Sequence, residues 1–173
     1  FLKLSGSQET LMLHNNAIES LTAIETDIRN ISHDLKNQLI WDEVGFRNEI
    51  ENTIKERSEI GHFGFTLLYE QEEQWDALDY LYKINLCRML DEILQNIIKH
   101  AQATQVELHF FVEKNVFIVN SRDNGKGFSK HQQKKGIGLN NLKIRAKKLQ
   151  AHLQIVSQLG EGTTISVHFF KKE

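Results

Sequence analysis

The sequence predicts an α+β protein: a two-layer sandwich in which helices cover one face of a mostly antiparallel sheet, preceded by a long helix. Three observations predict this fold. Segments with apolar residues three and four apart alternate with short runs rich in β-branched and aromatic residues. From residue 42 the order is helix, strand, helix, strand, strand, helix, strand, strand. Turn residues near positions 114 and 161 join neighbouring strands as hairpins.

The composition is that of a folded protein rather than of a disordered chain. Of the 173 residues, 40% are hydrophobic and 25% are charged. The net charge of −2 gives no overall basic field, so we expect no direct binding of nucleic acid. The lone cysteine, Cys87, excludes an internal disulfide and fits a reducing, cytoplasmic compartment.

The chain starts at Phe1 without a methionine, and we expect it to be part of a longer protein. No apolar run approaches the about 18 residues of a membrane-spanning helix. If the intact protein is anchored in the inner membrane, the anchor is therefore expected in the missing N-terminal part.

The first 40 residues predict one long helix. Between Gln8 and Lys36, apolar residues recur in steps of three and four, with polar residues between them. A helix of this length would extend about 40 Å, which suits a bundle formed with partner helices. A coiled-coil linker is the alternative. We therefore divide the chain into a helical segment, residues 1–40, and an α/β domain, residues 41–173.

The elements of the second part follow from changes of hydrophobic period. A helix is expected over 42–59, then a strand over 63–70 that ends in an acidic loop, and a long helix over 77–101. Two strands within 105–125 flank a turn at Glu113-Lys114-Asn115, a helix follows over 138–149, and a hairpin over 153–170 turns at Gly160-Glu161-Gly162.

The long helix over 77–101 carries a polar stripe. Its members are spaced by four, and they are Arg88, Glu92, Asn96 and His100, with Lys99 beside them. Such stripes commonly stabilise an exposed helix face through side-chain pairs. Asparagine, however, is a poor helix former inside a helix. An amide oxygen near a carboxylate suits Mg²⁺, and Lys99 suits a phosphate, so both interpretations stay open at this point.

The stretch DNGKGF, residues 123–128, directly follows a predicted strand. Asp-Asn-Gly chemistry often means only a turn. Gly125 and Gly127 would also let a planar ligand approach the backbone closely. Asp123 could then accept a hydrogen bond from an amino group such as the exocyclic amine of adenine.

Two further glycine motifs lie downstream. Gly136 and Gly138 open a helix in GIGL, where free backbone amides form an anion site. The preceding SKHQQKK, residues 129–135, is polar and basic, as expected of a lid over phosphates. The stretch GEGTTI, residues 160–165, has the composition of a β-turn.

Taken in order, these motifs resemble the ATP-binding domain of sensor histidine kinases. That domain has the Bergerat fold, which it shares with gyrase, heat-shock-90 and mismatch-repair ATPases. The resemblance covers residues from about 43 to 170. The phrases NIIKHAQA and GLNNLKIRAKKL are most similar to the subfamily of nitrate-sensor and desaturase-regulating kinases.

The resemblance implies a role for each motif residue, with ATP and Mg²⁺ as cofactors. Glu92 would be the acid that orients or activates the nucleophile, and Asn96 would be the Mg²⁺ ligand. Lys99 and His100 would lie near the phosphates, Asp123 would contact the adenine amine, and Gly125 and Gly127 would make room for the base. Gly136 and Gly138 would pass beneath the phosphates, Leu139 would complete this nucleotide-binding motif, and Thr163 would support Asp123.

The resemblance also implies an activity and partners. The chain would be the catalytic portion of a protein-histidine kinase that transfers the γ-phosphoryl group of ATP to a histidine upstream of this sequence, for relay to the receiver domain of a response regulator. The intact protein would form a homodimer through its helical bundle. The alternative hypothesis is a non-catalytic nucleotide-binding module that binds partners through its helix. A third hypothesis is a related Bergerat ATPase or serine kinase.

His33, in ISHDLKNQL, looks like the phosphoacceptor, but its position argues against that role. In the family, the acceptor lies on the first of two antiparallel bundle helices. Roughly 28 residues separate His33 from Gly61, and most of them belong to the helix predicted over 42–59. The remainder cannot supply a second bundle helix of about 20 residues. We therefore interpret residues 8–36 as the second helix of the hairpin.

His33 should not become labelled when this chain is incubated with radiolabelled ATP and Mg²⁺. Imidazole beside Asp34 is a competent nucleophile, so position rather than reactivity excludes it. A longer chain carrying the upstream helix should be labelled at the upstream histidine, also after His33→Gln. Acid-labile phosphate mapped to His33 in the present chain would show that the helix assignment is wrong.

Overall fold

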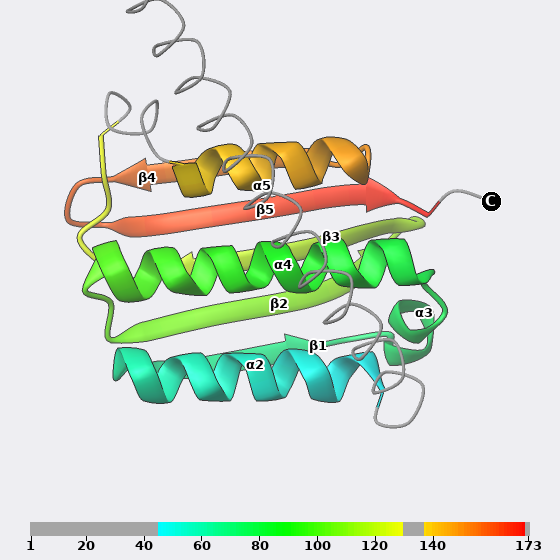
Figure 1. Ribbon diagram of the computed structural model, residues 1–173, viewed down its shortest axis with the longest axis horizontal. Helices are drawn as coiled ribbons and strands as arrows, with labels where there is room; N and C mark the ends of the chain where they lie inside the picture. Colours follow the sequence, from blue (N-terminus) through cyan, green and yellow to red (C-terminus); the bar gives the residue numbers. More distant parts are fainter. Residues whose placement is uncertain (1–44, 130–136, 172–173) are drawn as a thin grey trace, which may run out of the picture. The chain divides into compact units, whose positions relative to one another are not determined.

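The computed structural model describes residues 45–129 and 137–171, which fall within one compact unit. The elements are α2 (Phe46–Gly61), β1 (Gly64–Tyr69), α3 (Glu72–Asp76), α4 (Tyr80–Asn96), the π-helix η1 (Ile97–Ala101), β2 (Gln105–Glu113), β3 (Val116–Asp123), α5 (Ile137–Lys148), β4 (His152–Gln158) and β5 (Gly162–Phe170) (Figure 1). The predicted helix over 8–36, with His33, and Gly136 lie outside the described residues.

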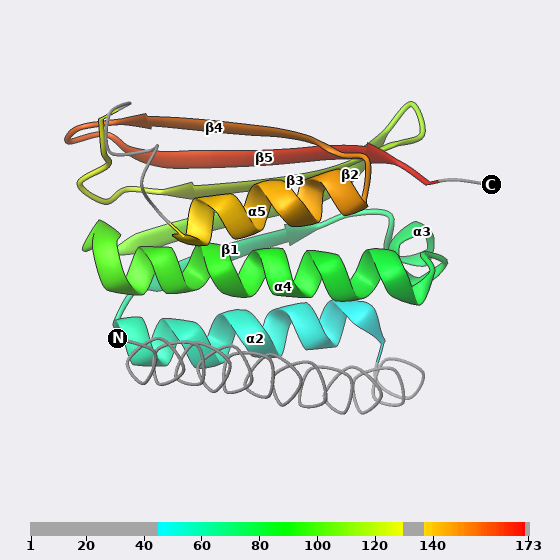
Figure 2. The same cartoon turned by 45° about the horizontal axis from the view of Figure 1, so that its top comes forward.

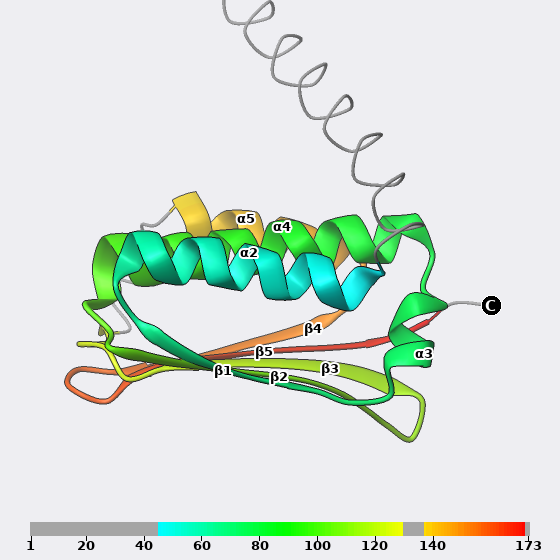
Figure 3. The same cartoon turned by 90° about the horizontal axis from the view of Figure 1, so that it is seen from below.

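The described part is a two-layer sandwich. One layer is a five-stranded sheet with the order β1-β2-β3-β5-β4. Only the β1–β2 pair is parallel, and the other three pairs are antiparallel. The helices α2, α4 and α5 all lie on one face of the sheet (Figure 3). The predicted fold class is therefore confirmed.

Helix α4 is the central element of the helical layer. It lies between α2 and α5 (Figure 2). Residues Phe46, Ile50 and Ile54 of α2, spaced by four, are fully buried. Arg57 of α2 also pairs with Asp91 of α4: its Nη2 lies 2.6 Å and its Nε 2.9 Å from Asp91 Oδ1. An apolar stripe and a charged contact thus fix α2 beside α4.

The short helix α3 corrects the prediction of an acidic loop after the first strand. Its five residues carry Trp75, which is 0% exposed. The Trp75 ring packs edge-on against Phe110 and Phe117, with centroids 5.3 and 5.0 Å apart. Its Nε1 donates a hydrogen bond to the Glu70 carbonyl at 3.0 Å. Burial of one large aromatic side chain holds this polar segment against the end of the sandwich.

The long helix predicted over 77–101 is also corrected. It begins at Tyr80, and its last five residues are a π-helix. The winding of the helix therefore changes directly after Asn96, in the stretch that carries Lys99 and His100. The π-helix ends at Ala101, and the next residue, Gln102, has a φ of 54°.

The positions of the two hairpins agree with the sequence. Lys114 and Asn115 have φ values of 50° and 66°, as a two-residue hairpin turn requires. Gly160, in the turn between β4 and β5, and Gly162, the first residue of β5, have φ values of 81° and 83°. Over the described ranges, no helix is both long and apolar enough to cross a membrane.

Trp75→Ala should lower the free energy of unfolding by about 3–5 kcal/mol, because it leaves a large cavity among packed aromatic rings. Leu81→Ala is the control, because Leu81 is 57% exposed on α4, and it should cost within about 0.5 kcal/mol. Urea unfolding of both variants measures the difference. Equal losses would contradict the assignment of α3 to the core.

Candidate functional site

A cavity of about 790 Å³ opens at one end of the sandwich. The end of α4 and η1, the segment after β3 and the turn between β4 and β5 all lie there, at the left of Figure 1. The predicted site residues that line it are Glu92, Asn96, Lys99, His100, Asp123, Gly127, Gly138, Leu139 and Thr163. Four motifs that are separate in the sequence therefore meet in one cavity, and its volume is in the usual range for small-molecule sites.

Asp123 is the buried acidic group of this cavity. It is the last residue of β3 and is 5% exposed. Its Oδ1 accepts a hydrogen bond from the backbone N–H of Gly125 at 2.8 Å. Burial raises the pKa of Asp123, and the N–H groups of Gly125 and Thr163 that donate to the carboxyl group oppose this rise. A buried acceptor is thus held in a fixed direction by two backbone donors.

The glycines of the 123–128 segment are required by close packing within the protein. A Cβ at Gly125 would meet the Ala101 carbonyl oxygen at 2.5 Å. Gly127 has a φ of 61°, and a Cβ there would overlap with the carbonyl oxygen of Gln158. Gly127 lines the cavity, whereas Gly125 packs behind it against η1. The binding role of Gly125 stays a prediction.

Glu92 and Asn96 face the start of α5. A Cβ at Gly138 would overlap with Glu92 Oε1 and would lie 3.0 Å from Asn96 Oδ1. The amide of Asn141 donates to Glu92 Oε2 at 3.3 Å. The buried Nδ2 of Asn96 has no hydrogen-bond partner among the described residues. Burying an amide group without a hydrogen-bond partner costs free energy, so this unpaired Nδ2 points to a ligand.

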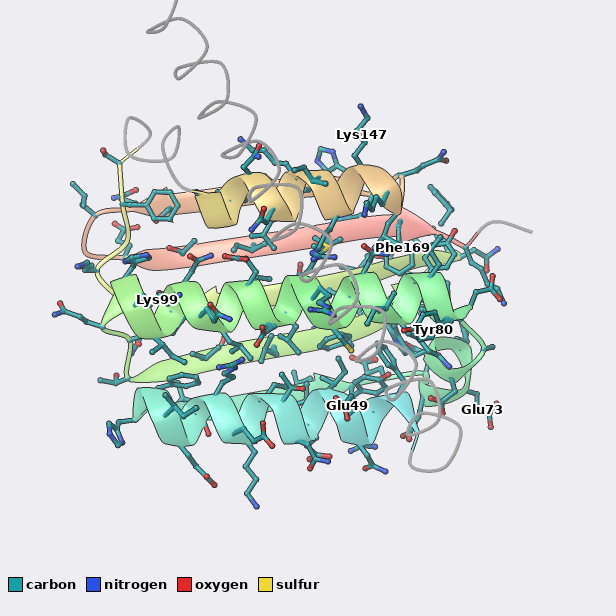
Figure 4. All side chains as sticks on the ribbon, viewed as in Figure 1. Glu49, Glu73, Tyr80, Lys99, Lys147 and Phe169 are labelled. Atoms are coloured by element: carbon teal, nitrogen blue, oxygen red, sulfur yellow. The ribbon has the colours of Figure 1, made fainter. Side chains whose placement is uncertain are left out.

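Basic side chains lie at the mouth of the cavity. Lys99 and His100, both exposed, come from η1, and Figure 4 shows Lys99 near the C-terminal end of this helical run. The Lys99 Nζ donates to Gln95 Oε1 at 3.0 Å, which fixes the side chain along the helix. Lys126 also lines the cavity. No role was predicted for Lys126, although it lies between the two glycines of DNGKGF.

Asn124 is a second residue that the sequence analysis left without a role. Its Oδ1 accepts the backbone N–H groups of Thr104 and Gln105 at 2.9 and 3.0 Å. Its Nδ2 donates to Thr104 Oγ1 at 2.9 Å. The Asn-Gly pair indicated only a turn. The side chain in fact ties the segment after β3 to the start of β2.

The ligand atoms that these residues offer are of the kind that binds a magnesium nucleotide. No group of three His, Cys, Asp or Glu side chains that could hold a metal occurs within 45–129 and 137–171. Mg²⁺ is commonly held by one or two protein oxygens together with substrate phosphates. The amide oxygen of Asn96, which lies near the start of α5 where Gly138 has no side chain, meets this description.

A family comparison agrees with this geometry. The sequence model of the histidine kinase-, DNA gyrase B- and HSP90-like ATPases matches residues 82–173, more than half of the chain. The chain belongs to this ATPase family. Its matched region begins in α4 and contains every motif that lines the cavity. ATP is accordingly the ligand class of the domain.

Several relatives carry names from bacterial signalling. The chain is 31% identical over 142 residues to the signal transduction histidine-protein kinase/phosphatase DegS of Brevibacillus brevis, a match that covers 82% of this chain and 36% of DegS. It is 25% identical over 169 residues to the oxygen sensor histidine kinase NreB of Staphylococcus carnosus, covering 96% of this chain and 48% of NreB. The chain thus spans less than half the length of these relatives.

Solved structures share the fold. The histidine kinase AdeS of Acinetobacter baumannii superposes with a TM-score of 0.61 at 15% identity, covering 88% of this chain and 84% of AdeS. The histidine kinase domain of the blue-light activated kinase EL346 of Erythrobacter litoralis gives 0.59 at 18% identity, covering 71% and 61%. The predicted Bergerat fold is confirmed.

Gly162→Ala should destabilise the protein much more than Gly160→Ala. Both glycines have a positive φ, so the backbone cost of alanine is shared by the two variants. Only at Gly162 would the new Cβ overlap with the backbone oxygen of Asp123, whereas nothing lies within 4 Å at Gly160. The difference between the thermal unfolding midpoints of the two variants measures the effect of this overlap. Equal losses of stability would mean that the hairpin does not pack against Asp123 as described.

Proposed function

We propose that this chain is the ATP-binding catalytic portion of a two-component sensor histidine kinase. The convergence of Asp123, Glu92 and Asn96 on one cavity carries the proposal. Membership of the ATPase family and the names of the sensor-kinase relatives support it. The chain would transfer the γ-phosphoryl group of ATP to a histidine upstream of the sequence described here.

Adenine recognition is assigned to Asp123. The ionised carboxylate accepts the exocyclic amine of the base, and its two backbone donors fix its orientation. Guanine carries an acceptor at the corresponding position, which a carboxylate repels. Thr163 supports this contact through its backbone, because it pairs with Asp123 in the sheet.

Phosphate binding is assigned to two basic residues and to the start of α5. Lys99 and His100 line the mouth of the cavity, and Gly138 and Leu139 belong to the first turn of α5, where backbone N–H groups favour anions. Asn96 would hold Mg²⁺ through Oδ1, and the ion would neutralise charge that develops on the phosphates. Gly136, which lies outside the described residues, is assigned the same role from the sequence motif alone.

Glu92 is assigned to the chemical step. A carboxylate beside a neutral imidazole accepts the proton on one ring nitrogen, which leaves the other nitrogen free as the nucleophile. That nitrogen forms a bond to the γ-phosphorus while the bond to the bridging oxygen of ADP breaks. The protein contributes mainly positioning and charge stabilisation.

The partners follow from this assignment. The acceptor histidine would lie on a bundle that makes the intact protein a homodimer, and the phosphoryl group would pass to the receiver domain of a response regulator. The helix predicted over residues 8–36 would contribute to that bundle.

Asp123→Asn should weaken ATP and ADP binding by about 1.5–3 kcal/mol, because it removes a charged acceptor at nearly constant size. In the parent chain, affinity should fall as the pH drops through the raised pKa of Asp123, since the protonated form cannot accept the amine. Titration of a fluorescent ATP analogue at several pH values measures both effects. The control is Asp79→Asn, an exposed aspartate just before α4. Unchanged binding in Asp123→Asn would refute the adenine contact.

Glu92→Gln should leave nucleotide affinity nearly unchanged but greatly reduce phosphotransfer to a supplied histidine-containing bundle domain. The reason is that Glu92 lies toward the Asn96 side of the cavity rather than beside Asp123. Asn96→Asp should likewise reduce transfer more than binding, and Glu107→Gln, an exposed residue of β2, serves as the matched control. Transfer by Glu92→Gln at the parent rate would exclude the catalytic role, and no transfer by the parent chain would favour a non-catalytic module.

A further inference from the structure

The hydroxyl group of Ser157 lies where three segments meet. Ser157 belongs to β4, on the edge of the sheet. Its Oγ lies 2.9 Å from the backbone N of Phe128, 3.0 Å from the carbonyl oxygen of Gly162 and 3.0 Å from Thr163 Oγ1. One side-chain atom of β4 therefore connects the segment after β3 to the first two residues of β5.

The chemistry of the partners fixes the direction of each hydrogen bond. A serine hydroxyl offers one donor and two acceptor positions. The Gly162 carbonyl can only accept, so Ser157 donates to it. The Phe128 N–H can only donate, so Ser157 accepts there. The remaining acceptor position receives the hydroxyl of Thr163, and the hydrogen-bonding capacity of Ser157 is then fully used.

Two of the three partners of Ser157, Gly162 and Thr163, also border Asp123. The backbone oxygen of Asp123 packs so closely on Gly162 that a Cβ at this glycine would overlap with it. Thr163 is the sheet partner of Asp123, and its backbone N–H donates to the carboxyl group. Phe128 ends the segment that starts at Asp123. The Ser157 hydroxyl thus holds together the structures on both sides of the proposed base-binding carboxylate.

Backbone contacts elsewhere hold the rest of this segment. The Lys126 N–H donates to the Ala101 carbonyl at 2.8 Å, and the Gly160 N–H donates to the Lys126 carbonyl at 2.8 Å. At the start of the segment, the Asn124 side chain binds β2. At the Phe128 end, the hydrogen bond to Ser157 is the side-chain contact that joins the segment to the hairpin. Ser157 itself does not line the cavity.

We propose that Ser157 is a positioning residue for adenine recognition: its hydroxyl holds the 123–128 segment and the β4–β5 hairpin in the arrangement that aims the Asp123 carboxylate into the cavity. The inference rests on the proposed adenine contact of Asp123. According to this inference, Ser157 affects which base is bound although it lies outside the cavity. Phosphate binding, on the opposite side of the site, does not depend on it.

The test compares Ser157→Ala with the parent chain in titrations of ATP, GTP and inorganic tripolyphosphate. Ser157→Ala should bind ATP about tenfold more weakly, the effect of losing one to two hydrogen bonds. The preference for ATP over GTP should fall, and tripolyphosphate binding should stay unchanged. The midpoint of the pH dependence of ATP affinity should also rise, because a displaced Thr163 N–H no longer lowers the pKa of Asp123.

Two further variants separate positioning from general damage. Ser157→Thr keeps a hydroxyl with the same donor and acceptor positions and should restore the preference for ATP. Ser166→Ala is the matched control, because Ser166 lies on β5 between the buried Ile165 and Val167 and so faces the other side of the sheet. It should bind all three ligands as the parent chain does. If Ser157→Ala does not fold, Ser157→Cys keeps the shape but hydrogen-bonds weakly, and the same loss is expected.

Unchanged ATP affinity and ATP preference in Ser157→Ala would overturn the inference. So would an equal loss of ATP, GTP and tripolyphosphate binding, because that pattern means general disruption of the site. A parent chain that binds no adenine nucleotide would instead refute the proposed function. The two failures are therefore distinguishable.

Discussion

Close contact between backbone segments around Asp123 is the constraint on which the site depends. The 123–128 segment is enclosed between η1 and the β4–β5 hairpin, at distances that leave no room for a Cβ at Gly125, Gly127 or Gly162. This packing keeps water away from the carboxyl group and raises its pKa. The same packing brings two backbone N–H groups to the carboxyl oxygens. A carboxylate held in this way is a specific acceptor because its orientation is set before a ligand arrives.

The π-helix η1 contributes to this packing from the helical layer. It ends α4 with a wider turn and brings the Ala101 carbonyl to the Lys126 N–H and the Ala101 side chain against Gly125. It also carries Lys99 and His100 to the mouth of the cavity. A short stretch of irregular helix thus links the proposed phosphate-binding cations to the proposed base-binding segment. Such π-helical segments are often found at functional sites.

The cavity divides into two chemically different sides. Asp123, with its backbone donors, forms a side suited to a neutral base. Glu92, Asn96 and the start of α5 form a side suited to phosphates and a hard cation. The two sides come from separate elements of the fold, α4 with α5 and β3 with the hairpin. The proposed roles in base recognition and in phosphoryl transfer therefore belong to different elements of the fold.

The sequence alone predicted the fold class, the positions of both hairpins and nine of the residues that line the cavity, because these depend on local period, turn chemistry and motif order. It did not single out Lys126, and it did not show that Gly125 packs behind the cavity. It did not determine α3, where one buried tryptophan outweighs an acidic composition. It also missed η1, and it gave no role to Asn124 or Ser157. The partners of Asn124 lie 19 and 20 residues away, and Phe128 lies 29 residues from Ser157, so only the tertiary structure brings these groups together. Serine and asparagine are common turn and strand-end residues, and no local pattern distinguishes those that connect distant segments.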